Sequence, residues 1–243
     1  MLTATPDVDQ VFLGWTINGT LRSYTNPVQL VLSGDRTIIA GFAPRPAFQD
    51  VTASSVASEA ITQLAARGII RGYDPTTFGP NDPTQRAQMA ALIARAVGWD
   101  TEDHGNPFPD RCDPLAPTNC VDSALWRNVG TLAFYGVAHG YPGGTYEPRS
   151  PVLSGQVISF VSRAMVARGI WQLQPDDPAL YPNVPTASGH RQDIATYVHY
   201  AGALPDLPLR GAFTDWDQTA TRAWFARVLW LALASQYNQG VIH

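Results

Sequence analysis

Arginine stands in the first turn of two predicted helices, at positions that correspond along the sequence. Between Arg86 and Arg222, Ser154 occupies the same place in a third predicted helix. A cation in this turn opposes the helix dipole by roughly a few tenths of a kcal/mol, so helix formation does not explain the arginines. Two roles stay open for them: an ion pair with an aspartate of a neighbouring segment, and contact with an anionic group of a ligand.

Tyrosine follows glycine at the end of two related loops. Tyr73 and Tyr141 each end a Gly-x-x-x-Gly-Tyr loop, in which Gly72 and Gly140 are the second glycines. Flat amphipathic rings suit stacking on sugars, but aromatic rings serve mainly in burial, so a turn anchor between helices is the favoured interpretation. We expect Gly72 and Gly140 to adopt positive φ angles, which glycine allows without steric cost.

Two cysteines flank a loop that is too polar and proline-rich to lie in a core. A disulfide between Cys112 and Cys120 is the natural interpretation for a protein outside the cytosol. The chain-entropy argument assigns about 2–3 kcal/mol to closing so short a loop. The alternative is two unrelated thiols. Together with the nearby His104, the cysteines do not complete a tetrahedral zinc site.

The carboxylates show no catalytic pattern. Asp110, Asp113 and Asp122 are candidate calcium ligands, but they lack the alternating spacing of known calcium loops. The three glutamates lie in different predicted segments, and neither a Gly-x-Ser-x-Gly motif nor a phosphate loop occurs. We therefore expect no catalytic residues, no metal and no cofactor, and hence a chain that is not an enzyme.

Composition narrows the class of protein. The 243 residues carry a net charge of −4, with 45% hydrophobic and 15% charged residues, which favours a globular chain and disfavours nucleic-acid binding. The longest apolar run, residues 228–234, is shorter than the ~18 residues that a membrane span needs. The amino terminus lacks the basic and apolar regions of a secretory leader. We expect either a cytoplasmic protein or, as favoured below, the end of a longer polypeptide.

Two kinds of pattern divide the chain. Residues 1–43 alternate and carry Asn-Gly and Gly-Asp turns, which predicts a small β unit, and a proline-rich linker follows. Beyond residue 46, one apolar stripe at helical spacing appears three times at a lag of 68 residues, over residues 89–97, 157–165 and 225–233. Because a lone stripe cannot bury itself, three copies of one unit should pack against one another.

The helical region resembles the S-layer homology family, strongly in the first copy, well in the second and poorly in the third, which lacks the Gly-Tyr loop. The motifs that carry the resemblance are the Gly-Tyr loops, the aromatic-x-Asp starts Phe48-Gln49-Asp50 and Phe108-Pro109-Asp110 with the divergent Tyr181-Pro182-Asn183, and the helix starts Gln85-Arg86-Ala87-Gln88 and Thr221-Arg222-Ala223-Trp224. Residues 1–43 resemble the small β repeat of bacterial surface proteins and internalin-like adhesins. A further strand normally precedes that repeat, so we expect the chain to start inside one.

This resemblance implies a mainly α fold. Three helix-loop-helix units would form a pseudo-threefold bundle, preceded by a small β unit. The implied domains are a truncated β repeat with its linker at 1–46, a first unit at 47–105, a second at 106–172 and a divergent third at 173–243. Because three stripes in one chain supply their own packing partners, we expect a monomeric module within a larger polypeptide.

The resemblance also implies a function outside the cell, at the cell wall or S-layer. The module would anchor a protein non-covalently by binding a secondary cell-wall polysaccharide, often pyruvylated in this family, in grooves between units. One groove would join Arg86 to Gly72 and Tyr73, and the groove of Ser154 would be weak. The alternatives are a structural S-layer or adhesin packing module with decayed sugar sites, and a fragment of a secreted enzyme. The implied ligand-binding residues are Arg86, Arg222, Gly72, Tyr73, Gly140 and Tyr141.

Overall fold

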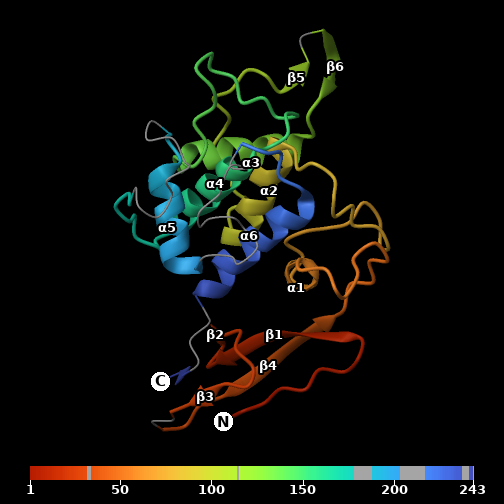
Figure 1. Ribbon diagram of the computed structural model, residues 1–243, viewed down its shortest axis with the longest axis vertical. Coiled ribbons are helices and arrows are strands. Elements are labelled where there is room, and N and C mark those ends of the chain that lie inside the picture. Colours follow the sequence, from red (N-terminus) through yellow and green to blue (C-terminus); the bar gives the residue numbers. More distant parts are fainter. Residues whose placement is uncertain (32–33, 114, 178–187, 203–216, 237–240, 243) are drawn as a thin grey trace. The chain divides into compact units, whose positions relative to one another are not determined.

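The computed structural model describes residues 1–243 apart from 32–33, 114, 178–187, 203–216, 237–240 and 243. The chain forms two compact units, residues 1–80 with 233–243 and residues 81–232 (Figure 1). The third aromatic-x-Asp start predicted from the sequence, at residues 181–183, lies outside the described residues.

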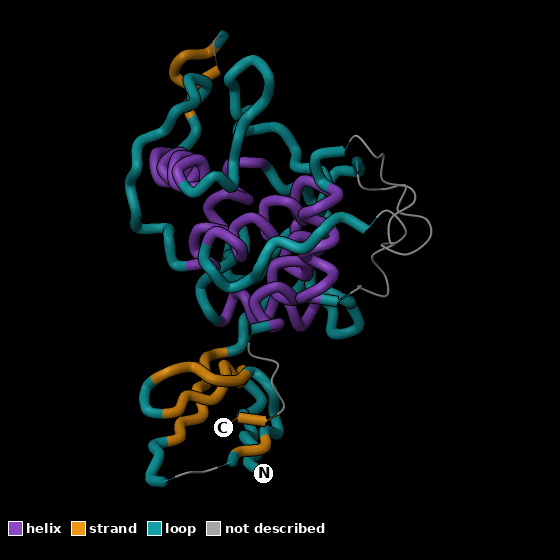
Figure 2. The backbone as a smooth tube through the Cα atoms, turned by 90° about the vertical axis from the view of Figure 1, so that its left-hand side faces the viewer, coloured by secondary structure: helices purple, strands orange, loops and turns teal. Residues whose placement is uncertain are grey.

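The first unit contains a small antiparallel sheet, whose strands are orange in Figure 2. The strand order is β2-β1-β4, and β3 pairs with β7 in parallel. Asn18 and Gly19, both with positive φ, join β1 to β2 through the predicted Asn-Gly turn, so the β unit expected for residues 1–43 is confirmed. The elements are β1 (Gln10–Ile17), β2 (Thr20–Ser23), β3 (Gln29–Leu30), β4 (Ile38–Pro44), α1 (Ser58–Ala66) and β7 (Val241–Ile242).

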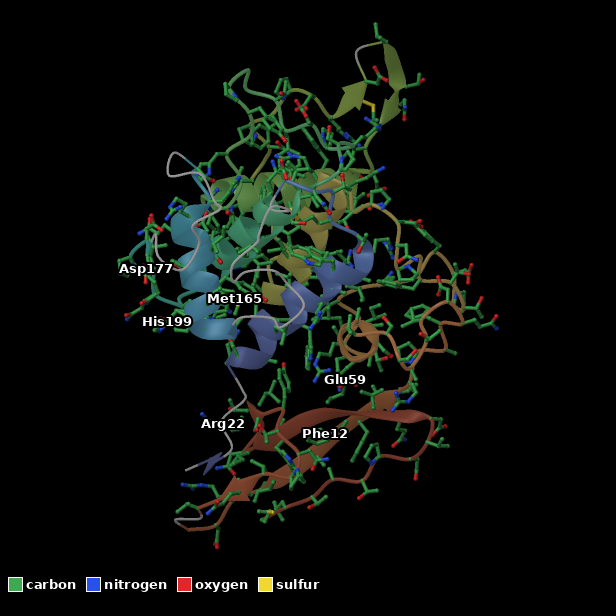
Figure 3. All side chains as sticks on the ribbon, viewed as in Figure 1. Phe12, Arg22, Glu59, Met165, Asp177 and His199 are labelled. Carbon is green, nitrogen blue, oxygen red and sulfur yellow. A yellow bond between two sulfur atoms is a disulfide. The ribbon has the colours of Figure 1, made fainter. Side chains whose placement is uncertain are left out.

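A small apolar core holds this sheet together. Trp15 on β1 is buried with Ala4 and Val28, and Phe12, which is labelled in Figure 3, packs against them from the same strand. The Trp15 indole Nε1 donates to the carbonyl of Thr25 at 3.2 Å, which satisfies the one polar atom of the buried ring.

Arg67, the residue after α1, ties that helix to the sheet. Its Nη2 donates to the carbonyl of Leu13 at 2.6 Å, and its guanidinium carbon lies 4.6 Å from the centroid of the Tyr24 ring. Its Nη1 donates to the carbonyl of Gln63 in the helix at 3.0 Å. One side chain therefore bonds to the sheet and to the helix at once.

The second unit is mainly helical. Helix α2 packs on α3 and α4, and α4 packs on α5. The predicted stripes are inside, with Ile93, Val161 and Val228 at most 1% exposed. The expected mainly α fold is thus only partly right, because strands add a clear β component. The elements of this unit are α2 (Arg86–Val97), β5 (Cys112–Asp113), β6 (Ala116–Cys120), α3 (Ser123–Phe134), α4 (Ser154–Ala167), α5 (Arg191–Ala201) and α6 (Arg222–Ser235), the last through residue 232.

Three lead-in segments, residues 83–85, 151–153 and 219–221, precede α2, α4 and α6 and bond to one another in a closed ring. The N–H of Thr84 donates to the carbonyl of Ala220 at 3.0 Å, and the N–H of Ala220 donates to the carbonyl of Val152 at 2.8 Å. The N–H of Val152 closes the ring at the carbonyl of Thr84, at 2.9 Å. The ring brings the amino termini of three helices together.

The predicted disulfide is confirmed. Cys112 and Cys120 are bonded across the short hairpin of β5 and β6, visible as the yellow bond in Figure 3. Arg149 Nη2 donates to the carbonyl of Asn119 at 2.6 Å and fastens the hairpin to the loop before α4. The disulfide therefore constrains a loop and not the helical core.

Replacing Cys112 and Cys120 by serine is expected to lower the free energy of unfolding by less than the ~2–3 kcal/mol that chain entropy assigns to the bridge. Without the bridge the hairpin can open while the helices stay packed. Urea unfolding measures the loss, and limited proteolysis should cut residues 113–119 faster in the variant. A loss above that limit, or two free thiols in the unreduced protein, would contradict the assignment.

Candidate functional site

The three positions that align in the sequence are the first residues of three long helices. Arg86 begins α2, Ser154 begins α4 and Arg222 begins α6. Each donates its backbone N–H to a carbonyl just before the neighbouring lead-in segment, at 2.8–3.0 Å. The first N–H of a helix has no partner within the helix, and here the fold supplies one. The three side chains therefore start from equivalent, fixed backbone positions.

Arg86 is enclosed, with only 3% of its surface exposed. Its guanidinium carbon lies 4.7, 4.6 and 5.6 Å from the ring centroids of Tyr141, Tyr146 and Phe160. Its Nε donates to the carbonyl of Tyr146 at 2.8 Å, and its Nη1 to Oε1 of Gln156 at 3.3 Å. Among the described residues no carboxylate pairs with Arg86. Aromatic faces and neutral oxygens stabilise this charge instead.

Tyr141 and Gln156 form the open edge of this Arg86 cluster, which comprises Arg86, Tyr141, Tyr146, Gln156 and Phe160. Both are half-buried, and Gln156 Nε2 donates to the Tyr141 hydroxyl at 3.3 Å. Tyr146 lies fully inside, where its hydroxyl donates to the carbonyl of Arg86 at 3.0 Å and burial raises its pKa. The edge thus presents a ring and an amide above a positive charge that no carboxylate of the described residues pairs with, an arrangement suited to an anionic, hydroxyl-rich ligand.

Within the second unit, Arg86 contacts Tyr141 of the second Gly-Tyr loop. The expected grouping of Arg86 with Gly72 and Tyr73 stays a prediction, because these two residues belong to the first unit. Tyr73 is 59% exposed, and the Arg222 side chain is half-buried.

The two Gly-Tyr loops share one turn, in which the N–H of Tyr73 or Tyr141 donates to a threonine carbonyl four residues later at 2.8 Å. The aromatic-x-Asp starts support these turns. Asp110 accepts the N–H of Tyr146, Asp50 accepts that of Phe78, and each also accepts the next N–H. Loss of some surrounding water raises the pKa of the exposed Asp50 carboxyl, but the two backbone donors outweigh this effect and hold the pKa below its ordinary value.

Asp110 and the other candidate calcium ligands serve local backbone groups. Asp113 accepts the N–H of Leu115, and Asp122 accepts the N–H of Ala124, both at 2.8 Å. Within the described part of the chain, no group of three such side chains is placed to hold a metal ion.

The second glycines of the loops differ in backbone conformation. Gly140 has a φ of 69°, as predicted, whereas Gly72 does not have a positive φ, so that prediction is wrong for Gly72. What both positions require is space, because an added Cβ would overlap the carbonyl oxygen of Thr77 at Gly72 and lie 2.7 Å from that of Thr145 at Gly140. Beside Gly72 lies a cavity of about 330 Å³ that Arg71 also lines.

A second polar cluster, which sequence reasoning missed, lies between α4 and α5. Arg163 Nη2 and Asp193 Oδ2 are 2.7 Å apart, and the Ser159 hydroxyl lies 2.7 Å from Nδ1 of His190. Neither pair has a recognisable spacing, because its members come from segments about 30 residues apart in the chain. Burial, with the Arg163 guanidinium as a second cause, lowers the pKa of the His190 imidazole.

This lowered pKa predicts that stability falls as the medium becomes acidic. The folded imidazole stays neutral at a pH where the unfolded one, with a pKa near 6.5, takes up a proton. Protons then favour the unfolded chain. The contribution of neutral His190 to stability is therefore fully present well above pH 6.5 and is lost as the pH falls below that value. Urea midpoints at about pH 7.5 and about pH 5 should differ more in the wild type than in a His190→Gln variant. Equal differences would contradict the prediction.

Residues 47–90 match the family described as the S-layer homology domain. The matched segment contains Asp50, the first Gly-Tyr loop and Arg86, which are the residues whose geometry is given above. Among the described residues, no helix is long and apolar enough to cross a membrane.

Three relatives share part of their sequence with this chain. It is 30% identical over 133 residues to a "Cell surface protein" of Thermoanaerobacter kivui, covering 51% of this chain and 16% of that protein. It is 27% identical over 117 residues to an "Endoglucanase" of Bacillus sp. strain KSM-635, covering 48% and 11%. It is 24% identical over 142 residues to "Cell surface glycoprotein 1" of Acetivibrio thermocellus, covering 56% and 6%. The chain thus spans a small part of the length of each relative. The S-layer homology match and the similarity to the two surface proteins together indicate a location at the cell surface, in the cell wall or S-layer.

Proposed function

We propose that this chain anchors a larger polypeptide non-covalently to the cell envelope by binding an anionic cell-wall polysaccharide. In this proposal the anchoring module consists of three S-layer homology units. Each unit contains one long helix, which starts at Arg86, Ser154 or Arg222. The closed ring of lead-in segments and the equivalent starts of α2, α4 and α6 support this threefold interpretation. In this proposal the chain is monomeric and catalyses no reaction, and the preceding β unit belongs to a surface-protein repeat.

One observation carries the proposal: Arg86 is a buried cation without a carboxylate partner among the described residues, directly beneath a half-exposed tyrosine. A buried arginine with a structural role usually pairs with a carboxylate of the same protein, because an uncompensated buried charge is costly. An anionic sugar substituent, such as a carboxylate, would supply that charge from outside at the edge formed by Tyr141 and Gln156. A pyruvylated sugar carries such a group.

The second candidate is a structural packing module whose sugar sites have decayed. The near-complete burial of Arg86 favours it, since bonds to Tyr146 and Gln156 already occupy part of the guanidinium. The two candidates differ in one measurable respect, which is retention on isolated cell walls.

The test is co-sedimentation with sacculi purified from the source bacterium, before and after hydrofluoric acid extraction of their secondary polysaccharide. The wild type should sediment with intact sacculi only. Tyr141→Ala, which removes the open edge, should weaken retention about tenfold or more, equivalent to about 1.4 kcal/mol. Phe134→Ala is the matched control. The Phe134 ring is 62% exposed and lies outside the cluster, so its loss should leave retention on sacculi unchanged. Equal retention of wild type and Tyr141→Ala, or equal binding to extracted sacculi, would overturn the proposal.

A further inference from the structure

A cavity of about 500 Å³ opens in the second unit, away from the Arg86 cluster. Its walls come from the carboxy-terminal end of α3, the second half of α4 and the beginning of α5. This volume falls within the ~300–1,000 Å³ that is usual for small-molecule sites. His139 lines the cavity, and it stands two residues before Tyr141, so one loop contributes to both places.

One wall of the cavity carries paired charges. Arg163 Nη2 lies 2.7 Å from Asp193 Oδ2, and the two side chains are 29% and 8% exposed. That Oδ2 is buried and, within the described residues, receives no hydrogen bond of normal geometry in spite of the close cation. His139 Nδ1 lies 3.4 Å from Arg163 Nη1, and the exposed Gln192 completes the polar wall. Donors and acceptors therefore stand side by side.

Other lining residues are apolar or aromatic. Leu173, with 51% of its surface exposed, lines the cavity with Val166, Ala167 and Tyr135. Stacking on Trp99, with ring centroids 3.9 Å apart, fixes the plane of Tyr135. A ligand with both hydroxyl groups and a face of C–H groups matches a lining that is partly charged and partly apolar.

We propose that this cavity binds one neutral sugar residue of a cell-wall glycan, an inference that rests on the proposed function. Vicinal hydroxyls would donate to Asp193 and accept from Arg163, while the C–H face of the ring packs on Leu173. Charge sets the preference for a neutral residue: Asp193 already compensates Arg163, so an anion would compete with that carboxylate and a cation with the guanidinium. The Arg86 cluster, which has no carboxylate, takes the anionic part of the glycan instead.

Nuclear magnetic resonance tests this directly on the whole chain. Gly136 and Gly189 line the cavity, and their amide signals report on it. The probes are N-acetylglucosamine, N-acetylmannosamine and galactose, each titrated to ~50 mM because a single sugar bound at about 1 mM gains only about 4 kcal/mol. At least one probe should shift both signals in saturable fashion while leaving the signal of Gly72 unchanged. No saturable shift with any of the three would overturn the proposal.

Two variants separate binding from folding. Arg163→Gln removes the charged guanidinium donor and should weaken binding of the best probe at least tenfold. Because this change also leaves Asp193 without its cation, Ala167→Leu provides a second variant, which fills the cavity from the exposed end of α4 and removes no polar group. Ala167→Leu should weaken binding of the probe as much as Arg163→Gln does, while the signals of residues outside the cavity stay the same. Unchanged affinity in Ala167→Leu would place the sugar elsewhere and overturn the proposal.

The outcome is distinguishable from that of the anchoring experiment. Sacculus retention that depends on Tyr141, without saturable sugar shifts at Gly136 and Gly189, would leave the proposed function standing and refute this cavity. Sugar shifts at both glycines in a protein that sacculi do not retain would support the cavity and refute anchoring.

Discussion

Replacing Arg86 by alanine is expected to lower the free energy of unfolding by about 2–4 kcal/mol. The change removes a buried side chain that contacts three rings, and it leaves the carbonyl of Tyr146 without its donor. Loss of a buried hydrogen-bond partner costs about 1–3 kcal/mol, and loss of packing and cation–π contact adds to it. Urea unfolding followed by circular dichroism measures the loss.

A matched variant identifies which interaction dominates. Arg86→Met keeps most of the side-chain volume and removes the charge and the hydrogen bonds. If packing dominates, Arg86→Met should recover more than half of the stability lost in Arg86→Ala. If the bonds to Tyr146 and Gln156 dominate, both variants should lose similar amounts. Wild-type stability in Arg86→Ala would contradict the enclosed position of this residue.

This result matters for interpreting binding experiments. A variant of Arg86 that fails to bind sacculi can fail because it has lost the cluster and not the ligand contact. Sequence reasoning placed Arg86 in a ligand-binding groove, and a binding assay on Arg86→Ala alone would have appeared to support that role. A variant of Tyr141 tests the ligand contact more directly. The half-buried Tyr141 ring forms the edge of the cluster, and its removal leaves the Arg86 guanidinium in place.

Periodicity predicted the helical part of the fold well. The stripes at residues 89–97, 157–165 and 225–233 fall within α2, α4 and α6, since burial of one face imposes a helical spacing on the sequence. The turn at Asn18-Gly19 and the disulfide were equally accessible, because each depends on residues that are close in the chain.

Contacts between elements that are distant in the sequence could not be predicted from the sequence. The pairing of Arg86 with Tyr141 and the ion pair of Arg163 with Asp193 join separate elements, and no local pattern encodes which elements become neighbours. The ring of lead-in segments uses backbone groups, which every residue carries, so side-chain identity gives no signal for it. Gly72 shows a related limit, since glycine is required for close approach as well as for positive φ.

Gly140 combines both of these requirements, and replacing it by alanine is expected to cost about 3 kcal/mol of unfolding free energy. Its φ of 69° costs a residue with a Cβ about 1–2 kcal/mol, and overpacking against the Thr145 carbonyl and the Phe108 ring adds about 1–3 kcal/mol. Gly144 in the same loop is the matched control, because its φ is 78° but an added Cβ would meet nothing within 4 Å. Gly144→Ala should therefore show the backbone cost alone, and the difference between the two variants in urea unfolding measures the cost of the close approach.

Because the loop of Gly140 also positions Tyr141 over Arg86, Gly140→Ala should lose sacculus retention as well, whereas Gly144→Ala should keep it. Equal losses of stability in both variants would show that the Phe108 ring and the Thr145 carbonyl move aside, and that backbone conformation alone selects glycine at this position.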